Sequence, residues 1–301
     1  MREALIIGGE SIAPGEQKMV DLKLARLSTS TDMHMPVNVI RSRRDGPTLL
    51  ICAAIHGDEV NGVEVIRRLC NSISPNRLRG TLIAIPIVNV YGFLHHSRYL
   101  PDRRDLNRCF PGSAKGSMAS QLASTFITEI VSKCTHGIDL HTAAIHRENL
   151  PQIRACMDDD VTRMMAEAFQ APVIMDTNVQ PGTLRETASK LGIPWLVYEA
   201  GEALRFDEVS IRAGVDGVMN VMRALHMLAK KSGRKIIAPK LAKGSTWMRA
   251  PQSGIMRLIV PSGALVKRGD TLGFVADPYG DNETPIISDR SGIVIGRANL
   301  P

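Results

Sequence analysis

Aromatic residues are scarce in this chain of 301 residues, at 4% of the total, which argues against a surface for stacking nucleic-acid bases. Long apolar runs are also absent. The longest, at 49–55 and 82–90, have the length of a strand and fall far short of the roughly 18 residues of a membrane span. The N-terminal MREALIIGGE lacks the apolar core of a signal peptide. We therefore expect neither nucleic acid nor a membrane as a partner.

The cysteines and the net charge argue against a disulfide-rich protein and give no sign of a nucleic-acid binder. The five cysteines are odd in number and scattered without a CxxC pair, so a disulfide framework is not expected and a reduced, cytoplasmic location fits best. Lys and Arg number 37 against 30 Asp and Glu, a net charge of +7. So mild an excess permits an anionic substrate without demanding nucleic acid.

Strands and helices alternate between residues 37 and 232, the pattern of an α/β domain with a mostly parallel sheet and helices on both faces. Continuous apolar runs predict buried strands over 48–55 and 81–90. Shorter runs predict strands over 37–40, 137–140, 153–157 and 194–199. Apolar residues three and four apart predict helices over 59–70, 119–133, 161–169 and 215–230.

The pattern changes near residue 232. A polar stretch at 230–235 is the predicted linker, and short apolar runs separated by turn residues fill 246–301 without a helical period. The chain is thus expected to comprise an α/β domain, residues 1–232, and a small all-β domain, residues 233–301. The chain stops soon after a second Ser-Gly-Ile at 291–293, so one expectation is that this second domain is incomplete.

His56 and Glu59 directly follow the strand predicted to end at Ile55. Ligands of parallel sheets bind beyond the carboxyl ends of strands, and a His and a Glu three residues apart can reach one metal ion. His141 follows another short strand and offers a third ligand. Catalytic zinc commonly takes three protein ligands and leaves one position open. The alternative is a polar turn beside an ordinary buried histidine.

Two further clusters carry possible chemistry. The arginine-rich segment 98–108 suits the bidentate recognition of a carboxylate, although a solvated basic loop or a phosphate-binding patch has the same composition. Glu199 ends an apolar strand, where a carboxylate has little reason to lie unless it acts. A Glu beside zinc-activated water is the usual base of metal-dependent amide hydrolysis. The alternative for Glu199 is contact with solvent or with an arginine.

Five short motifs occur together and in one order across residues 37–230. They are HGDEVNG at 56–62, NVYG at 89–92, RYLPDRRDLNRCFPG at 98–112, DLHT at 139–142 and YEAG at 198–201. On these motifs the sequence resembles the aspartoacylase and succinylglutamate desuccinylase family, relatives of zinc carboxypeptidases. The resemblance implies a carboxypeptidase-like α/β/α domain followed by a smaller β domain.

The resemblance also implies roles for single residues. The matching zinc ligands are His56, Glu59 and His141, the general base is Glu199, and the carboxylate-binding pair is Asn107 and Arg108. Arg98 matches the arginine that polarises the scissile carbonyl, and Asp105 a carboxylate that orients a zinc-bound histidine. The stretch between Arg98 and Asp105 is longer than in the aspartoacylase branch, so Arg103 or Arg104 competes with Arg98. Glu202 is a second candidate base.

The second domain has a resemblance of its own. Residues 260–272 resemble a half-motif of lipoyl and biotinyl domains, which implies a sandwich of that type. The corresponding hairpin loop, 276–285, has no lysine, so we expect no covalently attached lipoate or biotin.

Together these features predict the zinc-dependent hydrolysis of the amide bond of a short N-acyl amino acid, of N-acetyl or N-succinyl type. One Zn²⁺ per chain and a small anionic substrate are expected, and a homo-oligomer is compatible with the sequence. The alternatives are a zinc carboxypeptidase acting on peptides and a non-catalytic anion-binding module on the same fold. A complete ligand set together with Glu199 argues against the second alternative.

Overall fold

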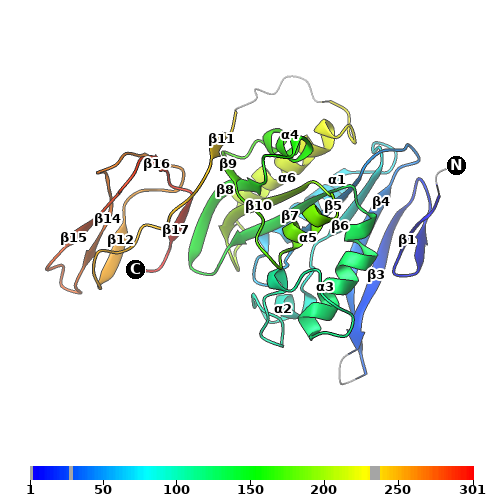
Figure 1. The fold of residues 1–301 in the computed structure, drawn as a ribbon, viewed down its shortest axis with the longest axis horizontal. Coiled ribbons are helices and arrows are strands. Elements are labelled where there is room, and N and C mark those ends of the chain that lie inside the picture. The colour runs from blue at the N-terminus through cyan, green and yellow to red at the C-terminus, as the bar shows by residue number, and fades with distance from the viewer. Residues whose placement is uncertain (1–2, 27–29, 231–237) are drawn as a thin grey trace.

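A large mixed sheet forms the centre of the molecule in the computed structural model, which describes residues 3–26, 30–230 and 238–301 (Figure 1). Its strands, from one edge to the other, are β11 (Lys240–Ala242), β9 (Val173–Asp176), β8 (Arg147–Ala155), β10 (Trp195–Glu202), β7 (His136–Ala143), β5 (Thr48–Ala53), β6 (Thr81–Ile85), β4 (Asp32–Arg41) and β3 (Gln17–Arg26), and β17 (Gly296–Ala298) pairs with β8. The inner strands β10, β7, β5 and β6 run parallel, and β8 and β4 flank them antiparallel.

Helices cover both faces of this sheet, and each face has its own hydrophobic core. One face carries α1 (Asn61–Ser72), α4 (Asp160–Phe169) and α6 (Glu208–Ala224). The other carries α2 (Val90–Leu94), α3 (Met118–Glu129), α5 (Leu184–Lys190), the short turns η1 (Leu106–Arg108) and η2 (Val131–Lys133), and the hairpin of β1 (Leu5–Ile7) and β2 (Glu10–Ile12). The expected α/β/α arrangement is therefore confirmed.

Several predicted ends of strands and helices were wrong. The observed helices begin at capping side chains, which the pattern of apolar residues does not reveal. The strand predicted over 81–90 ends at Ile85, and the Asn89 side chain caps α2 by accepting a hydrogen bond from the Gly92 N–H at 2.8 Å. The helix predicted over 215–230 begins at Glu208, where the Asp207 carboxylate accepts bonds from two backbone N–H groups, and it ends at Ala224.

Beyond residue 245 the described elements are short strands. β12 (Ile255–Leu258), β14 (Thr271–Ala276) and β15 (Thr284–Ile287) form one antiparallel sheet, and β13 (Leu265–Val266) pairs with β16 (Gly292–Ile293). Most of the predicted linker, 231–235, lies outside the described residues. Both β11 and β17 lie after residue 232 and yet pair with the large sheet, so the division at 232 stays a prediction.

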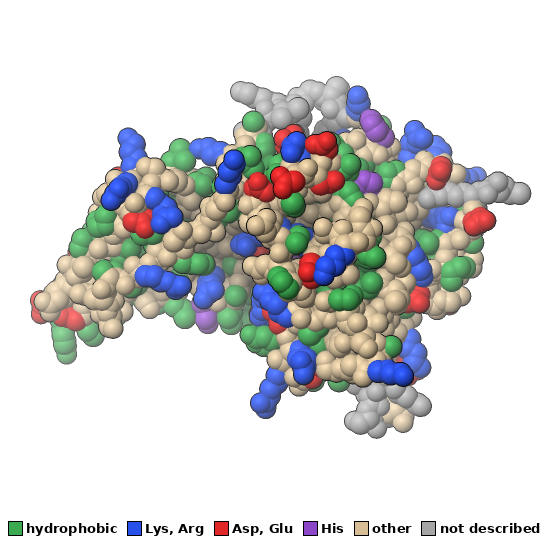
Figure 2. Space-filling model, viewed as in Figure 1, with side chains coloured by type: hydrophobic (Ala, Val, Ile, Leu, Met, Phe, Trp, Pro, Cys, Tyr) green, Lys and Arg blue, Asp and Glu red, His purple; other side chains and the backbone are tan. Residues whose placement is uncertain are grey.

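Lys and Arg side chains are spread over the face seen in Figure 2 and do not gather in one stripe. Among the helices of the described residues, none is both long and apolar enough to cross a bilayer.

Close packing of α6 on α4 yields a test of the fold. A methyl group at Gly217 would lie 2.1 Å from the ring of Phe169. Alanine favours a helix over glycine by about 1 kcal/mol, but overpacking a core costs about 1–3 kcal/mol. We expect Gly217→Ala to lower the free energy of unfolding, measured by urea denaturation. Val209→Ala is the control, since that position on α6 is 70% exposed and should change stability little. A Gly217→Ala protein as stable as the wild type would contradict this packing.

Candidate active site

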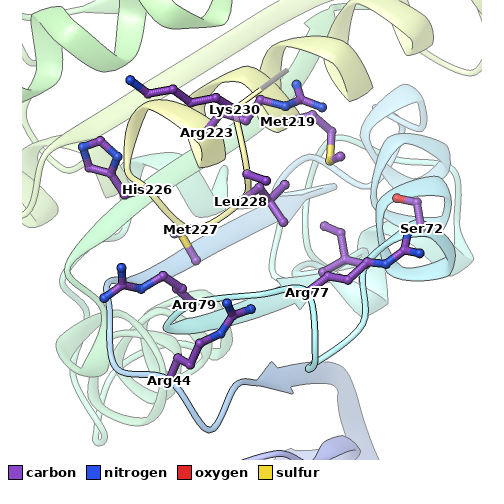
Figure 3. A pocket seen from close by; sticks show the side chains of 12 residues that line it. Arg44, Ser72, Arg77, Arg79, Met219, Arg223, His226, Met227, Leu228 and Lys230 are labelled. Atoms are coloured by element: carbon purple, nitrogen blue, oxygen red, sulfur yellow. The ribbon is translucent and has the colours of Figure 1, made fainter. Parts of the chain in front are cut away.

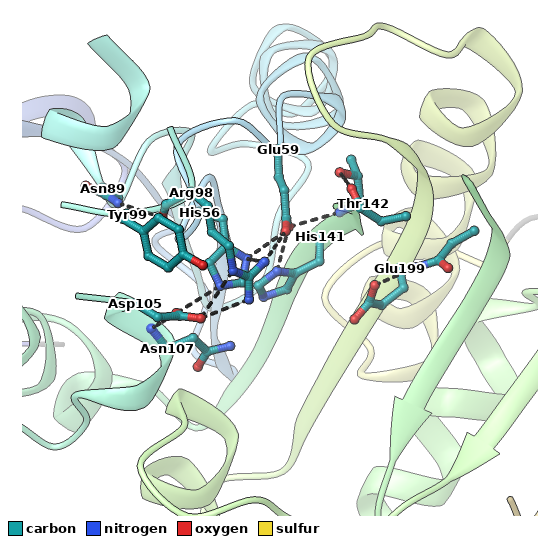
Figure 4. Close-up of polar contacts among 12 residues, drawn as sticks. His56, Glu59, Asn89, Arg98, Tyr99, Asp105, Asn107, His141, Thr142 and Glu199 are labelled. Atoms are coloured by element: carbon teal, nitrogen blue, oxygen red, sulfur yellow. Dashed lines mark hydrogen bonds and ion pairs between the residues drawn. The ribbon is translucent and has the colours of Figure 1, made fainter. Parts of the chain in front are cut away.

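The ends of neighbouring parallel strands bring the predicted metal ligands together. Ala53 of β5 lies opposite Leu140 of β7, so His56 and His141 emerge at the same edge of the sheet. Glu59 reaches this edge from the turn before α1. The ligand atoms of the two histidines and Glu59 all lie within 4.8 Å of one another, and all three residues are buried (Figure 4). We call these three residues the triad.

Two glycines of the first motif permit this approach. A Cβ at Gly57 would lie 2.0 Å from the backbone carbonyl carbon of Gly92, so only glycine lets the loop pass α2. A Cβ at Gly62 would lie 2.6 Å from the Cβ of Ala53, so glycine lets the start of α1 lie directly on β5. The motif therefore supplies both the ligands and the space in which they meet.

Both histidines of the triad turn the same ring nitrogen toward Glu59. The Nδ1 atoms of His56 and His141 lie 2.7 Å from Oε1 and Oε2 of Glu59, respectively. Behind the rings, Nε2 of His56 lies 3.1 Å from Asp105 Oδ1, and Nε2 of His141 lies 2.7 Å from Asp139 Oδ2. Such carboxylates orient metal-binding histidines and raise their basicity. Two imidazoles, each oriented by a carboxylate on its outer nitrogen, and the Glu59 carboxylate fit a divalent metal such as zinc.

The charges in the triad are strongly coupled. Burial would raise the pKa of Glu59, but His56 and His141 lower it well below its usual range. Burial would lower the pKa of His141, but Asp139 and Glu59 raise it well above its ordinary value. Glu59 therefore stays ionised in a buried place, where its negative charge favours a cation.

Asp139 is a site residue that was not among those predicted. It is buried, and the Cys52 thiol lies 3.5 Å from its Oδ1, on the other side from His141. The signal was available in the sequence, because residues two apart on a strand lie on the same face. An Asp two positions before a predicted histidine ligand is therefore a candidate orienting group.

Among the three competing arginines, Arg98 is the one that contacts the triad. Its guanidinium donates to Asp105 Oδ2 at 2.9 Å and to Glu59 Oε1 at 3.3 Å, whereas Arg103 and Arg104 are exposed. Burial would raise the pKa of Asp105, but the adjacent histidine and Arg98 lower it below its usual range. The segment 98–108 thus brings one positive charge, on Arg98, and one negative charge, on Asp105, to the site.

Glu199 lies on β10 directly opposite His141 of β7 in the parallel register. Its side chain is 18% exposed, and its Oε2 accepts a hydrogen bond from Asn149 Nδ2 at 2.8 Å. Arg154 Nε lies 3.5 Å from its Oε1. Burial raises the pKa of Glu199, opposed by Arg154 and His141. A carboxylate held in one orientation, with its pKa shifted toward neutrality, suits a general base.

The other candidate base, Glu202, is engaged elsewhere. Its Oε1 accepts from the His146 N–H at 3.0 Å, and its Oε2 accepts from Asn299 Nδ2 at 2.9 Å. These contacts tie the end of β10 to the neighbouring loop and to the last residues of the chain. The geometry therefore favours Glu199 over Glu202 as a base.

Asn107 and Arg108 follow Asp105 in a single turn of 3₁₀ helix. Asn107 Oδ1 accepts from the Leu184 N–H at 3.0 Å, and Figure 4 shows its side chain beside Asp105. Arg108 is exposed, and its guanidinium donates to the Asn107 carbonyl at 2.7 Å. Within the described part of the chain, neither side chain forms a hydrogen bond or ion pair with the triad, so their predicted role stays a prediction.

Comparisons with known proteins assign this part of the chain to a family. A family model described as the succinylglutamate desuccinylase/aspartoacylase catalytic domain matches residues 45–225, which include every site residue described above except Asn299. An N-alpha-acetyl-L-2,4-diaminobutyric acid deacetylase of Halomonas elongata is 25% identical over 280 residues, 87% of this chain and 80% of that protein.

Solved structures are similar over nearly the whole chain. A succinylglutamate desuccinylase/aspartoacylase from Rhodobacter sphaeroides has a TM-score of 0.81 and 26% identity, and the match covers 94% of this chain and 90% of that one. A product-bound ectoine utilization protein from Ruegeria pomeroyi has a TM-score of 0.82 and 23% identity, with 98% and 90% covered, and shares the fold.

The carboxylate behind His141 gives a test of the metal site. Asp139→Asn removes the negative charge but preserves the shape, so we expect zinc affinity to fall by about 10–100-fold. His141→Ala should abolish most of the binding, since it removes a ligand. Competition with a chromophoric chelator measures both. The control is Glu202→Gln, which removes a carboxylate from the same region without touching the triad. Unchanged affinity in both Asp139→Asn and His141→Ala would exclude this site.

Proposed function

Because the chain belongs to the succinylglutamate desuccinylase/aspartoacylase family, we propose that it is a zinc-dependent amidohydrolase that removes a short acyl group from an N-acyl amino acid. The observation that carries the proposal is the placement of Glu199 on the strand beside His141, next to a complete set of metal donors. The Halomonas relative is named as a deacetylase of an N-acetyl amino acid, which supports an acyl group of the acetyl or succinyl type.

In this proposal Glu199 moves the proton. The triad would hold the zinc ion, whose Lewis acidity would favour the activation of water for attack on the amide carbonyl. Glu199 accepts the proton of the attacking water and later delivers it to the leaving amine. Asn149 holds the Glu199 carboxylate in one orientation, and burial shifts its pKa toward the range in which a base works best. Arg98, which already contacts the triad, donates to the carbonyl oxygen as negative charge develops there.

Asn107 and Arg108 would hold the free carboxylate of the substrate. An exposed guanidinium can offer two parallel N–H groups to a carboxylate, and the adjacent amide can add a third donor. Fixing that carboxylate places the scissile carbonyl relative to Glu199, which is how binding energy is converted into rate.

We also propose that residues 233–301 form a second domain of lipoyl or biotinyl type that limits access to the site and carries no attached cofactor. Its β17 pairs with β8, and Gly296 lies opposite Asn149, the residue that orients Glu199. The Leu150 N–H also donates to the Ile295 carbonyl at 3.0 Å. A segment docked this close to the base favours short acyl substrates over the long peptides of a carboxypeptidase.

The substrate class is tested with a panel of N-acetyl and N-succinyl amino acids beside N-blocked dipeptides. The proposal expects turnover of one or more acylated amino acids and far lower turnover of the blocked dipeptides. Turnover of the dipeptides alone would favour the carboxypeptidase alternative, and binding without turnover would favour the non-catalytic module.

On the best substrate of that panel, Glu199→Gln should lower kcat by about 10²–10⁴-fold, since it removes the base but keeps the size of the side chain. Zinc content should stay at the wild-type value, because Glu199 is not one of the proposed ligands. Glu202→Gln is the matched control and should retain turnover. Wild-type turnover in Glu199→Gln would move the role of base to another residue.

Arg108→Lys tests the recognition of the carboxylate. A lysine keeps the charge but loses the fork of two N–H groups, and one charge-assisted bond is worth about 1.5–3 kcal/mol. We expect kcat/KM for the free acid to fall by about tenfold or more, and much less for the amide of the same substrate. Equal losses on acid and amide would assign Arg108 a structural role.

A further inference from the structure

A cavity lies at the end of the sheet opposite to the triad. It has a volume of about 740 Å³ and lies where the loop before β5, the loop before β6 and the end of α6 meet (Figure 3). The side chains that line it include six basic ones: Arg44, Arg77, Arg79, Arg223, His226 and Lys230. Among the described residues that line it, none carries a carboxylate.

The topology separates this basic cavity from the candidate active site. Arg44 precedes the first residue of β5, and Arg77 and Arg79 precede the first residue of β6. The triad lies beyond the other end of the same parallel strands. Strands of five or six residues span about 17–20 Å. A ligand in the basic cavity would therefore not contact the triad.

Hydrogen bonds to backbone carbonyl groups hold the walls of the basic cavity together. The Arg44 guanidinium donates to the carbonyl oxygens of Asn76 and Leu78 at 2.8 and 3.0 Å. The Arg79 N–H donates to the Met227 carbonyl at 2.9 Å, which ties the loop before β6 to the end of α6. The three segments are thus fixed relative to one another before any ligand arrives.

Several of the positive charges have no acidic partner. Arg223 donates to the neutral amide oxygen of Asn220 at 3.1 Å. Within the described residues, Arg77 and Arg79 form no ion pair with a carboxylate. Elsewhere on the same helices the arginines are paired, as Arg67 is with Glu64 and Arg212 is with Glu208. The guanidinium groups of Arg77, Arg79 and Arg223 thus gather at one cavity without a carboxylate partner among the described residues.

Like charges around one hollow repel each other and concentrate positive potential there, particularly where apolar side chains such as Ile73 and Met227 form part of the wall. Guanidinium groups match pairs of oxygens on phosphates and carboxylates. We propose that the basic cavity binds a small oxyanion with two or more negative charges, such as a diphosphate or a polycarboxylate, at a site separate from the substrate.

Titration calorimetry with inorganic pyrophosphate, and in a second arm with citrate, tests the proposal at physiological ionic strength. We expect saturable binding of at least one of the two anions, with one site per chain, and the stronger binder identifies phosphate or carboxylate chemistry. The His141→Ala protein should bind the same anion equally well, because the cavity is remote from the triad. Loss of binding in His141→Ala would place the anion at the metal site and overturn the proposal.

A pair of double variants separates the basic cavity from overall charge. Arg77→Ser/Arg79→Ser should weaken the affinity for the anion by tenfold or more. Arg67→Ser/Arg212→Ser removes the same two charges from exposed positions on α1 and α6, where the side chains are 61% and 74% exposed, and should leave the affinity unchanged. Arg223→Ser is the reserve variant if the first double variant does not fold. Equal weakening in both double variants would contradict the proposal.

The remaining outcomes also decide the question. A wild-type protein that binds neither anion would overturn the proposal. Binding only to vesicles that contain phosphatidylserine, without binding of either small anion, would assign this face to a membrane surface and would likewise reject a small-anion site.

Discussion

The carboxylate of Glu59 is the contact on which the candidate site depends. It faces His56 with one oxygen and His141 with the other, each at 2.7 Å, and the Thr142 N–H donates to it at 3.1 Å. A buried carboxylate is costly unless such partners surround it. The strand β7, the loop after β5 and the start of α1 must therefore keep one fixed arrangement. Asp105 and Asp139 complete this arrangement by fixing the outer nitrogens of the two histidines.

Parallel strands give the two ends of the sheet different chemistry. At the carboxyl ends, side chains of both signs converge from the segments after β5 and α2 and from β7 and β10, and the proposed zinc and substrate belong there. At the amino ends of β5 and β6, arginines from separate segments line one cavity, and the proposed anion site belongs there. The helix α6 runs between the two ends, from its cap at Asp207 after β10 to the wall of the basic cavity. One sheet thus supports two sites that need not compete for the same ligand.

The sequence predicted the long, strongly patterned elements and failed at short or polar ones. The run at 48–55 is recognisable because β5 is buried on both faces, and α1 shows its buried stripe. β9 has four residues, too few for a pattern, and the bounds of α6 depend on the Asp207 cap, which an apolar count does not register. The strands before residue 37 were not predicted. β1 pairs with the adjacent β2, and β3 pairs with the adjacent β4, but their mixed polar and apolar composition leaves little signal in the sequence.

By itself the sequence determined the family and predicted a set of metal donors and a base, because short motifs at strand ends carry their chemistry in local spacing. His56 and Glu59 share one turn, and Glu199 closes an apolar strand. Only the tertiary structure decided that Glu199 lies opposite His141 and that Asn149 donates a hydrogen bond to it. It further decided that Arg98 contacts the triad, whereas Arg103 and Arg104 are exposed. It also decided that arginines from three separate segments line one cavity. These outcomes depend on strand register and on the packing of distant segments, which residue spacing along the chain does not encode.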